Sequence, residues 1–469
     1  MQETLRRPTN RRSADNERLL ADIASFCQAA GMAESTFGRR VANDGKLVAR
    51  LRAGGRLTTQ TSDRIREYLL GGAPPAAAAP EAPPLPAPPQ AASRAAARFR
   101  FYDNRQKYLL FVSTCTEKWV VGQRVEAELA GIKPRPPALR VFDAGSGDGT
   151  VLTRLMRSMH DRFPNVPFYI VGKEISLEDV RLSLEKVPDR FHEHPSTVLV
   201  MTNMYYSEAP WLRPNSLAAA SGLVWHELAL TGSTAGQFER QISALQPFLA
   251  QNWTAKISAS SGNPLYERPV VLVIYRDDHR LLLDGVRPRQ GAARADYDLV
   301  IASQPYRARA STEFKAKKVI APLARALGPG GRLIGIHSCG GDPGMEIIQR
   351  VWPGESPFTM DRHELLRETR HALGPEARTL SFNAYADQRS RFRYTMHTLP
   401  SEVSSSIGTS TLLAAWNAAV YVAQIEDERL EPVMSDGRYL EATRAVLQRA
   451  GGLWFQNESY VISRHRFGG

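Results

Sequence analysis

The most informative segment of the chain is Val141-Phe-Asp-Ala-Gly-Ser-Gly-Asp-Gly-Thr-Val-Leu152. An apolar run ends in the carboxylate Asp143, glycines follow at positions 145, 147 and 149, and apolar residues then recur at helical spacing. Glycines suit a tight turn whose backbone approaches a ligand closely, because a Cβ would clash there. The helix that follows offers unpaired N–H groups at its start. The segment therefore predicts a strand, a glycine turn and a helix.

Three kinds of ligand use such a turn. A phosphate loop needs a lysine after its second glycine, and none follows here. A dinucleotide turn needs G-x-G-x-x-G, but Thr150 stands at the sixth position. The pattern D-x-G-x-G-x-G, however, resembles motif I of the class I S-adenosyl-L-methionine (SAM)-dependent methyltransferases. The resemblance implies SAM as cofactor. Its methionine end would contact the turn formed by Asp143, Gly145, Ser146, Gly147 and Gly149.

Two later strands carry polar residues at their ends. The apolar run from Phe168 ends in Glu174, which lies 31 residues after Asp143. A carboxylate at this position is expected to accept the ribose hydroxyls of a bound nucleoside. A solvent-facing acid at a strand end is the alternative. The strand Thr197-Val-Leu-Val-Met-Thr ends at Asn203, which by its position is expected to contact the adenine.

A second match lies at Leu327-Gly-Pro-Gly-Gly-Arg-Leu-Ile-Gly-Ile-His-Ser338. It resembles the turn and fifth strand of the same family, and it follows motif I in the expected order. The resemblance implies an α/β fold: a doubly wound, Rossmann-like methyltransferase sheet, mostly parallel with an antiparallel edge. The C-terminal run Leu453–Arg464 suits that edge. A small all-α domain is expected N-terminal to the methyltransferase domain.

The exit of the fourth strand, Ser303-Gln-Pro-Tyr306, resembles the Asp/Asn/Ser-Pro-Pro-Tyr/Phe segment of methyltransferases that act on amino groups. The resemblance implies that Ser303, Gln304 and Tyr306 contact the methyl acceptor. Gln304 replaces the first proline, which leaves transfer to an amino nitrogen open. A plain turn with a buried tyrosine is the alternative. His337 is either a general base or a satisfied strand-end histidine.

Arg307 and Arg309 beside this segment suggest an acidic or phosphate-bearing acceptor, unless they belong to a solvated loop. An aminopropyltransferase would need acids at the same strand exit to bind a polyamine. The chain has serine and glutamine there, which argues against that reaction.

Residues 204–290 are expected to form an insertion that builds the substrate pocket. They include a predicted helix near Gln237–Leu249 and a predicted hairpin of Pro269–Tyr275 with Arg280–Leu283. His226-Glu227 does not form the metalloprotease pattern H-E-x-x-H, because Leu230 replaces the second histidine. No metal site is expected.

Residues 16–71 predict a small domain of short helices joined by glycine turns, which resembles helix-turn-helix modules. Residues 1–71 hold 13 Lys and Arg against 8 Asp and Glu, so DNA is a possible partner through residues 34–52. The second helix would present Ser35, Thr36, Arg39 and Arg40. Docking to a protein is the alternative. A Pro/Ala-rich linker, residues 72–97, would then precede the methyltransferase domain, residues 98–469.

The composition sets further limits. The chain has 469 residues, a net charge of +12 and no apolar run of about 18 residues, so no membrane span is expected. Three widely spaced cysteines, Cys27, Cys115 and Cys339, suggest reduced thiols and a cytoplasmic location. We predict methyl transfer from SAM to an unidentified acceptor. The alternative is a SAM-sensing DNA-binding regulator that transfers no methyl group.

Overall fold

The computed structural model describes residues 11–42, 44–53, 57, 59–70, 105–258, 263–397 and 407–466. The chain forms two compact units, one up to Arg94 and one from Ala95 onward. The predicted linker at 72–97 lies outside the described residues, as do residues 98–104. Each unit is therefore described by itself.

The N-terminal unit is helical throughout most of its described residues. Its helices are α1 (Arg11–Ala29), α2 (Glu34–Ala42), α3 (Leu47–Arg52) and α4 (Thr59–Leu70). The rings of Phe26, Phe37 and Tyr68 meet edge to face, with centroids 5.6–5.9 Å apart. Ile23 and Ile65 are fully buried beside them. These side chains give the unit a core of its own.

The segment predicted to contact DNA lies mostly on α2 and α3. Ser35, Thr36 and Arg39 belong to α2. Two of the basic side chains on α3 are paired within the unit, because Arg52 contacts Glu34 at 2.7 Å and Arg50 contacts Asp44 at 2.8 Å. The side chain of Arg40 lies outside the described part. Contact with DNA stays a prediction.

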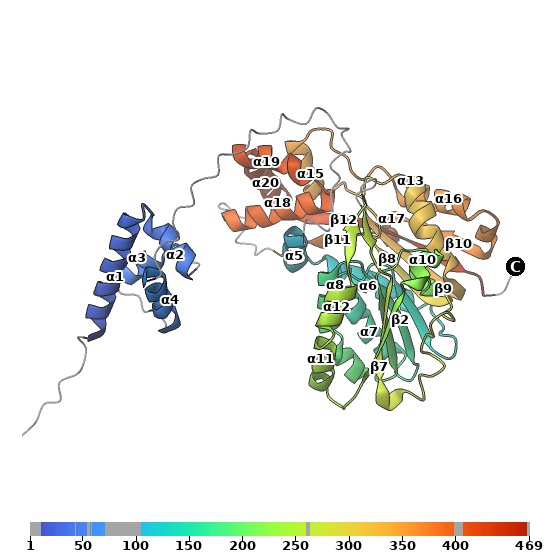
Figure 1. The fold of residues 1–469 in the computed structure, drawn as a ribbon. Helices are drawn as coiled ribbons and strands as arrows, with labels where there is room; N and C mark the ends of the chain where they lie inside the picture. Colours follow the sequence, from blue (N-terminus) through green and yellow to red (C-terminus); the bar gives the residue numbers. More distant parts are fainter. Residues whose placement is uncertain are drawn as a thin grey trace, which may run out of the picture. The chain divides into compact units, whose positions relative to one another are not determined.

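The second unit is built on one large mixed sheet with the strand order β10-β12-β9-β8-β1-β2-β3-β7-β4, with β11 pairing β12 (Figure 1). The strands of this sheet are β1 (Leu139–Asp143), β2 (Phe168–Lys173), β3 (Thr197–Thr202), β4 (Val224–Leu230), β7 (Val270–Arg276), β8 (Tyr297–Ser303), β9 (Leu327–Ser338), β10 (Leu380–Asn383), β11 (Arg391–Thr395) and β12 (Trp454–Arg464). A separate two-stranded sheet pairs β5 (Ala255–Ile257) with β6 (Pro264–Tyr266).

The centre of this sheet is a doubly wound, Rossmann-like arrangement. Five neighbouring strands are parallel, in the order β3-β2-β1-β8-β9. The chain runs outward from β1 to β2 and β3, and β8 and β9 are then added on the other side of β1, so the strand order reverses between β1 and β8. Ligands of such sheets bind outside the carboxyl ends of the strands at this reversal. Strand β12 pairs antiparallel with β9 and β10, which gives the antiparallel edge. The predicted fold class is confirmed by this strand order.

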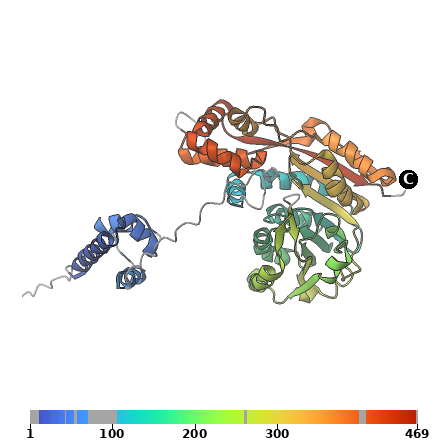
Figure 2. The ribbon, with the colours of Figure 1, turned by 45° about the horizontal axis from the view of Figure 1, so that its top comes forward.

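Helices cover both faces of the sheet because successive strand residues point to opposite sides. Val141 packs on one face and Phe142 on the other. The first face carries α6 (Glu117–Leu129), α7 (Thr150–Arg162), α8 (Leu177–Glu185), α9 (Pro188–Glu193), α11 (Ala235–Ser243) and α12 (Gln246–Asn252). The second face carries α14 (Ala321–Arg325), the π-helical segment Lys315–Ile320 before it and α16 (Arg362–Leu373). Figure 2 shows the helices on either side of the strands.

The insertion at 204–290 differs from its prediction. Its strands β4 and β7 extend the sheet beyond β3, and Arg280–Leu283 forms no strand, so the predicted hairpin is wrong. The reason is burial. Every residue of β7 is buried, so this strand needs a partner on each edge and cover on each face. The predicted helix at Gln237–Leu249 is two helices, α11 and α12, with Pro247 in the first turn of the second.

A group of helices at the carboxyl end of β9 forms a further subdomain, which we call the helical cap. It consists of α5 (Arg105–Thr114), α15 (Pro343–Val351), α18 (Thr409–Ala423), α19 (Asp427–Asp436) and α20 (Arg438–Ala450). Figure 1 shows these helices together above one end of the sheet. Their shared core includes the stacked rings of Trp352 and Trp416, with centroids 5.7 Å apart. The cap adds a third layer at the edge where the strands end.

Candidate active site

The glycine turn begins where β1 ends. The backbone N–H of Gly145 donates to Asp143 Oδ1 at 3.2 Å, and Gly147 and Gly149 have φ values of +51° and +77°. A Cβ on Gly149 would lie 2.5 Å from Ser183 Oγ, so this glycine allows close packing of the turn against α8. A Cβ on Gly145 would meet nothing within 4 Å. The turn is therefore closed at Gly149 and borders open space at Gly145.

Glu174 lies beside this turn at the end of β2. Its Oε2 accepts the Gly147 N–H at 2.9 Å, and its Oε1 accepts the N–H groups of Ile175 and Ser176 at 2.8 and 2.9 Å. Trp253 Nε1 donates to the Glu174 carbonyl oxygen at 3.0 Å. Burial raises the pKa of the Glu174 carboxyl, and nearby Asp179 raises it further. A carboxylate has about four acceptor positions, so the one left here is on Oε2.

Tyr108 on α5 and Lys118 on α6 lie over the turn. A Cβ on Gly147 would be 3.1 Å from the Tyr108 hydroxyl and 3.9 Å from Lys118 Nζ. Burial lowers the pKa of Lys118, but Tyr108, Glu117 and Asp148 together raise it above its ordinary value. The ammonium group is therefore protonated at neutral pH. Sequence motifs do not identify Lys118, because it reaches the turn from a helix that precedes β1.

Asp143 and Asn203 occupy the flanks of the site. Asp143 is 2% exposed, and burial raises the pKa of its carboxyl to about 6. Asn203 is buried after β3, where its Nδ2 donates to the Arg268 carbonyl at 2.8 Å and its Oδ1 accepts the Val270 N–H at 2.8 Å. Its amide thus braces the start of β7. A contact between Asn203 and an adenine stays a prediction.

Gln304 follows β8 at the position where the segment that it resembles has its first proline, and its backbone conformation excludes a proline there. Its φ is +48°, which a proline ring cannot adopt because the ring fixes φ near −65°. The Gln304 N–H donates to the Ile336 carbonyl at 2.8 Å, and its Nε2 donates to Ser338 Oγ at 2.9 Å. These two hydrogen bonds connect the Gln304 segment to β9. Ser303 ends β8 immediately before it, half-buried.

Tyr306 belongs to a buried hydrogen-bonded chain. Its hydroxyl lies 2.7 Å from His337 Nδ1, and His337 Nε2 lies 2.8 Å from Glu458 Oε1. Arg362 donates to Glu458 through its backbone N–H and through Nη1, both at 2.7 Å. These contacts lower the pKa of Glu458 to about 2 despite its burial. Because the ionised carboxylate can only accept, His337 donates to Glu458 from Nε2, and its Nδ1 shares the hydrogen bond with the Tyr306 hydroxyl.

Lys315 lies against the same tyrosine. Its Nζ is 5.2 Å from the centre of the Tyr306 ring and donates to the Ala308 carbonyl at 2.7 Å. Burial lowers the pKa of Lys315 to about 8. Together with Gln304 and His337, Lys315 and Tyr306 line a cavity of about 20 Å³ at the exits of β8 and β9. Such a cavity holds about one water molecule.

Arg309 does not serve the predicted acidic acceptor. Its Nη1 donates to the carbonyl oxygens of Ala423 and Gln424 at 2.9 and 2.7 Å, and its Nη2 contacts Glu355 at 2.6 Å. The side chain thus closes the C-terminal end of α18 in the helical cap. This internal use follows from helix chemistry, since the last carbonyls of a helix attract cations.

The depressed pKa of Glu458 predicts a pH dependence of stability. Its folded-state pKa of about 2 lies below the ordinary 4.5, so the unfolded chain takes up the proton first as pH falls. The stabilisation is fully present above pH 4.5 and is lost as pH falls towards 2. We expect the free energy of unfolding in urea to fall more steeply over this range in the wild type than in Glu458→Gln. Equal slopes would contradict the assignment.

Among the described residues, no group of three His, Cys, Asp or Glu side chains is placed to hold a metal ion. Within the same part of the chain, no helix is both long and apolar enough to cross a membrane.

The comparisons with known proteins come from solved structures. No protein-family model and no curated protein sequence matches the chain. Haemonchus contortus phosphoethanolamine N-methyltransferase 2, in complex with phosphomonomethylethanolamine and S-adenosylhomocysteine, is similar at 10% identity over 79% of this chain and 60% of that chain, with a TM-score of 0.29. A geranyl diphosphate methyltransferase in complex with GPP and sinefungin is 12% identical over 74% of this chain and 78% of that chain, with a TM-score of 0.28.

A mycolic acid cyclopropane synthase complexed with SAH and CTAB is 11% identical over 73% of this chain and 83% of that chain, with a TM-score of 0.26. Likenesses with TM-scores this low carry no argument about cofactor or reaction. The chain has the Rossmann-like fold that its resemblance to class I methyltransferases implied, and that assignment rests on its own strand order.

Proposed function

We propose that the chain binds SAM at the carboxyl ends of β1 and β2 and transfers its methyl group to an acceptor held near the exits of β8 and β9. One observation carries this proposal. The glycine turn borders open space at Gly145, at the point where the strand order reverses, and a carboxylate from the next strand contacts the same turn.

The residues present fit a sulfonium nucleoside. Lys118, above Gly147, would bind the methionine carboxylate, because it supplies a protonated cation beside the turn. Glu174 would accept a ribose hydroxyl at the remaining position on Oε2. The N–H groups of Ser146 and Gly147 are already donated to the Lys173 carbonyl and to Glu174, so the methionine end would pack against this part of the turn. Asn203 would contact the adenine only through the amide positions that are not used in its hydrogen bonds to Arg268 and Val270. Asp143 would hold the turn through its bond to Gly145.

When bound, SAM would supply an activated methyl group, so that an acceptor lone pair bonds to carbon while sulfur keeps the electrons of the broken bond. The protein then has to align the acceptor and exclude water. Gln304 and Ser303 would orient the acceptor, and Tyr306 would contact it. For an acceptor that must lose a proton, Tyr306 can take that proton on oxygen while passing its own to His337 Nδ1. The adjacent Glu458 carboxylate stabilises the resulting imidazolium.

The alternative of a SAM-sensing DNA-binding regulator gains no specific support from the described residues. Two of the basic side chains on α3 pair with acids of their own unit. The acceptor class is not fixed by the cofactor site, and an amino nitrogen is one option.

The cofactor site is tested by calorimetry of the full chain with SAM, using Glu174→Gln and the exposed Glu185→Gln as a matched pair. We expect Glu174→Gln to weaken SAM binding about fivefold, since it replaces a charge-assisted hydrogen bond by a neutral one, a difference of about 1 kcal/mol. Glu185→Gln should bind as the wild type does. Labelled methyl transfer from SAM into a fractionated cell extract then identifies the acceptor class. A wild-type chain that binds no SAM would overturn the proposal.

A further inference from the structure

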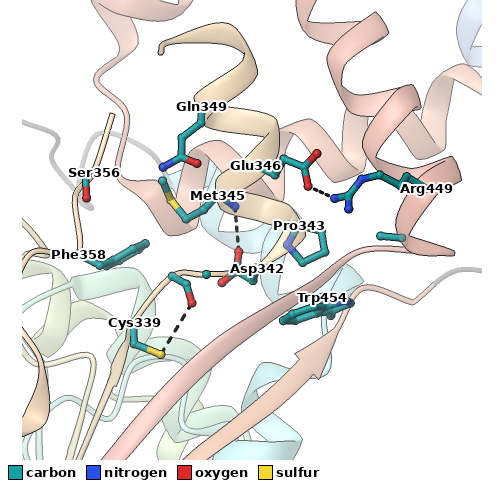
Figure 3. Close-up of a pocket in the computed structure, with 13 residues that line it drawn as sticks. Cys339, Asp342, Pro343, Met345, Glu346, Gln349, Ser356, Phe358, Arg449 and Trp454 are labelled. Carbon is teal, nitrogen blue, oxygen red and sulfur yellow. Dashed lines mark hydrogen bonds and ion pairs between the residues drawn. The ribbon is translucent and has the colours of Figure 1, made fainter. Parts of the chain in front are cut away.

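A second cavity, of about 600 Å³, opens where β9 ends and the helical cap begins (Figure 3). Its floor is the segment Cys339–Pro343, and its walls come from α15, the end of α20 and the start of β12. Phe358 and Trp454 stand on opposite sides of the Cys339–Asp342 segment in Figure 3, with Met345 above it. A volume of this size suits a small-molecule ligand.

The two rings give the cavity flat apolar walls. The guanidinium of Arg393 lies 3.9 Å from the centre of the Trp454 ring, and this contact holds the indole in place. Phe358 packs close to Gly340, where a Cβ would be only 3.0 Å from the ring. The φ of Gly340 is +69°, so the backbone there is suited to glycine and allows the ring to approach. Each ring offers a flat apolar surface against which a planar apolar group can stack.

The charged side chains around the cavity have hydrogen-bond or ion-pair partners within the protein. Asp342 Oδ1 accepts the Met345 N–H at 2.9 Å, and Oδ2 accepts the Gln456 N–H at 3.0 Å. Glu346 is paired with Arg449 and also with Arg350. Burial raises the pKa of the Cys339 thiol to about 11, so it is uncharged at neutral pH. Asp342 forms no ion pair with the described residues, but it is only 7% exposed, so no charge in the described lining is both exposed and unpaired.

The cavity lies next to the candidate transfer site. Phe358 lines both this cavity and the small one formed by Gln304, Tyr306 and His337. Strands β1, β8 and β9 are consecutive in the sheet, so their carboxyl ends are about 5 Å apart from one strand to the next. A ligand in the large cavity would have to direct one atom past Phe358 to reach Gln304.

We propose that this cavity binds the flat, uncharged aromatic body of the methyl acceptor, with its nucleophilic atom directed past Phe358 towards Gln304 and Tyr306. The inference rests on the proposed methyl transfer and adds the acceptor's chemical class. Stacking on Phe358 or Trp454 provides the recognition. Hydrogen bonds to ring substituents can come from Ser356 and from Gln349, whose Nε2 also donates to the Glu355 carbonyl at 3.2 Å.

The test compares four probes on the full chain by saturation-transfer NMR and calorimetry. They are 2-naphthol, its saturated non-planar counterpart decahydro-2-naphthol, the anion 2-naphthoate and the cation 2-naphthylmethylammonium. We expect 2-naphthol to bind with a Kd on the order of millimolar, as suits a fragment of its size. It should bind at least about fivefold more tightly than the other three, because only it is both flat and uncharged.

The variants Phe358→Leu and Trp454→Leu should each weaken 2-naphthol binding several-fold while leaving SAM binding unchanged. Phe314→Leu is the matched control, since Phe314 is 42% exposed and lies outside the cavity. Equal binding of 2-naphthol and decahydro-2-naphthol would overturn the inference, as would tighter binding of either charged probe. If the chain binds SAM but not 2-naphthol, the acceptor pocket is wrong and the proposed cofactor site stands. If it binds 2-naphthol but not SAM, the cavity binds aromatic ligands but has no role in methyl transfer.

Discussion

Gly145→Ala is expected to weaken SAM binding about 10- to 100-fold while leaving the melting temperature of the free protein unchanged. A methyl group at this position meets nothing within 4 Å in the free protein, and the φ of Gly145 is not in the left-handed region. The same methyl group would occupy space that the cofactor needs. Overpacking of a close contact costs about 1–3 kcal/mol, which corresponds to the stated range of affinity.

Gly149→Ala is the matched comparison, and its effect should fall on stability. Its Cβ would lie 2.5 Å from Ser183 Oγ and 2.8 Å from Ser183 Cα, at a φ of +77°. We expect a loss of about 1–3 kcal/mol in the free energy of unfolding. Calorimetry with SAM and thermal unfolding of both variants separate the two effects. Wild-type SAM affinity in Gly145→Ala would show that the cofactor does not lie against this turn.

The contrast between these glycines shows what sequence can and cannot resolve. The alternation of glycines after an apolar strand predicted the turn and its place in the fold. It could not distinguish a glycine that packs against α8 from one that borders open space, because that difference depends on Ser183, 34 residues later in the chain. The order of strands could likewise be predicted for β1, β2, β3, β8 and β9, since each is a short apolar run with a polar end.

Other features depended on contacts that no local pattern encodes. The strand β4 contains polar residues and is only partly buried, so Val224–Leu230 lacks the apolar signal that marked β7. The predicted hairpin failed for this reason, since the true partners of β7 come from distant parts of the chain. Lys118 reaches the turn from before β1. Glu458, which accepts the hydrogen bond from His337 Nε2, comes 121 residues after that histidine.

The helical cap could not be predicted from the sequence either. Its helices come from before β1, after β9 and before β12, so their common core is assembled only in three dimensions. An individual helix such as α18 carries apolar residues along most of its length, so the helix could be predicted but its packing partners could not. Our proposal for the acceptor places it beside the cap, which differs from the location expected from the sequence. The insertion at 204–290 was predicted to build the substrate pocket, but the large cavity lies between the cap and β9.

The largest loss of stability is expected from Arg362→Met. Arg362 is 2% exposed and Glu458 is fully buried, and the two contact through Nη1 at 2.7 Å. Removing the arginine leaves a buried carboxylate with His337 and one backbone N–H as its remaining close partners. Breaking a buried ion pair by removing one member costs about 3–5 kcal/mol. Urea unfolding at neutral pH measures this loss directly.

Arg391→Met provides the control, because Arg391 approaches the same carboxylate at 3.9 Å but its side chain is 42% exposed. An exposed pair contributes less than about 1 kcal/mol, so this variant should unfold nearly as the wild type does. The double variant Arg362→Met with Glu458→Leu should regain part of the loss, since no buried charge then remains. If Arg362→Met were as stable as Arg391→Met, the chain from Arg362 to Tyr306 would not be the rigid support that positions the acceptor site. The orientation of Tyr306 would then have to come from its packing against Lys315 and Tyr460 instead.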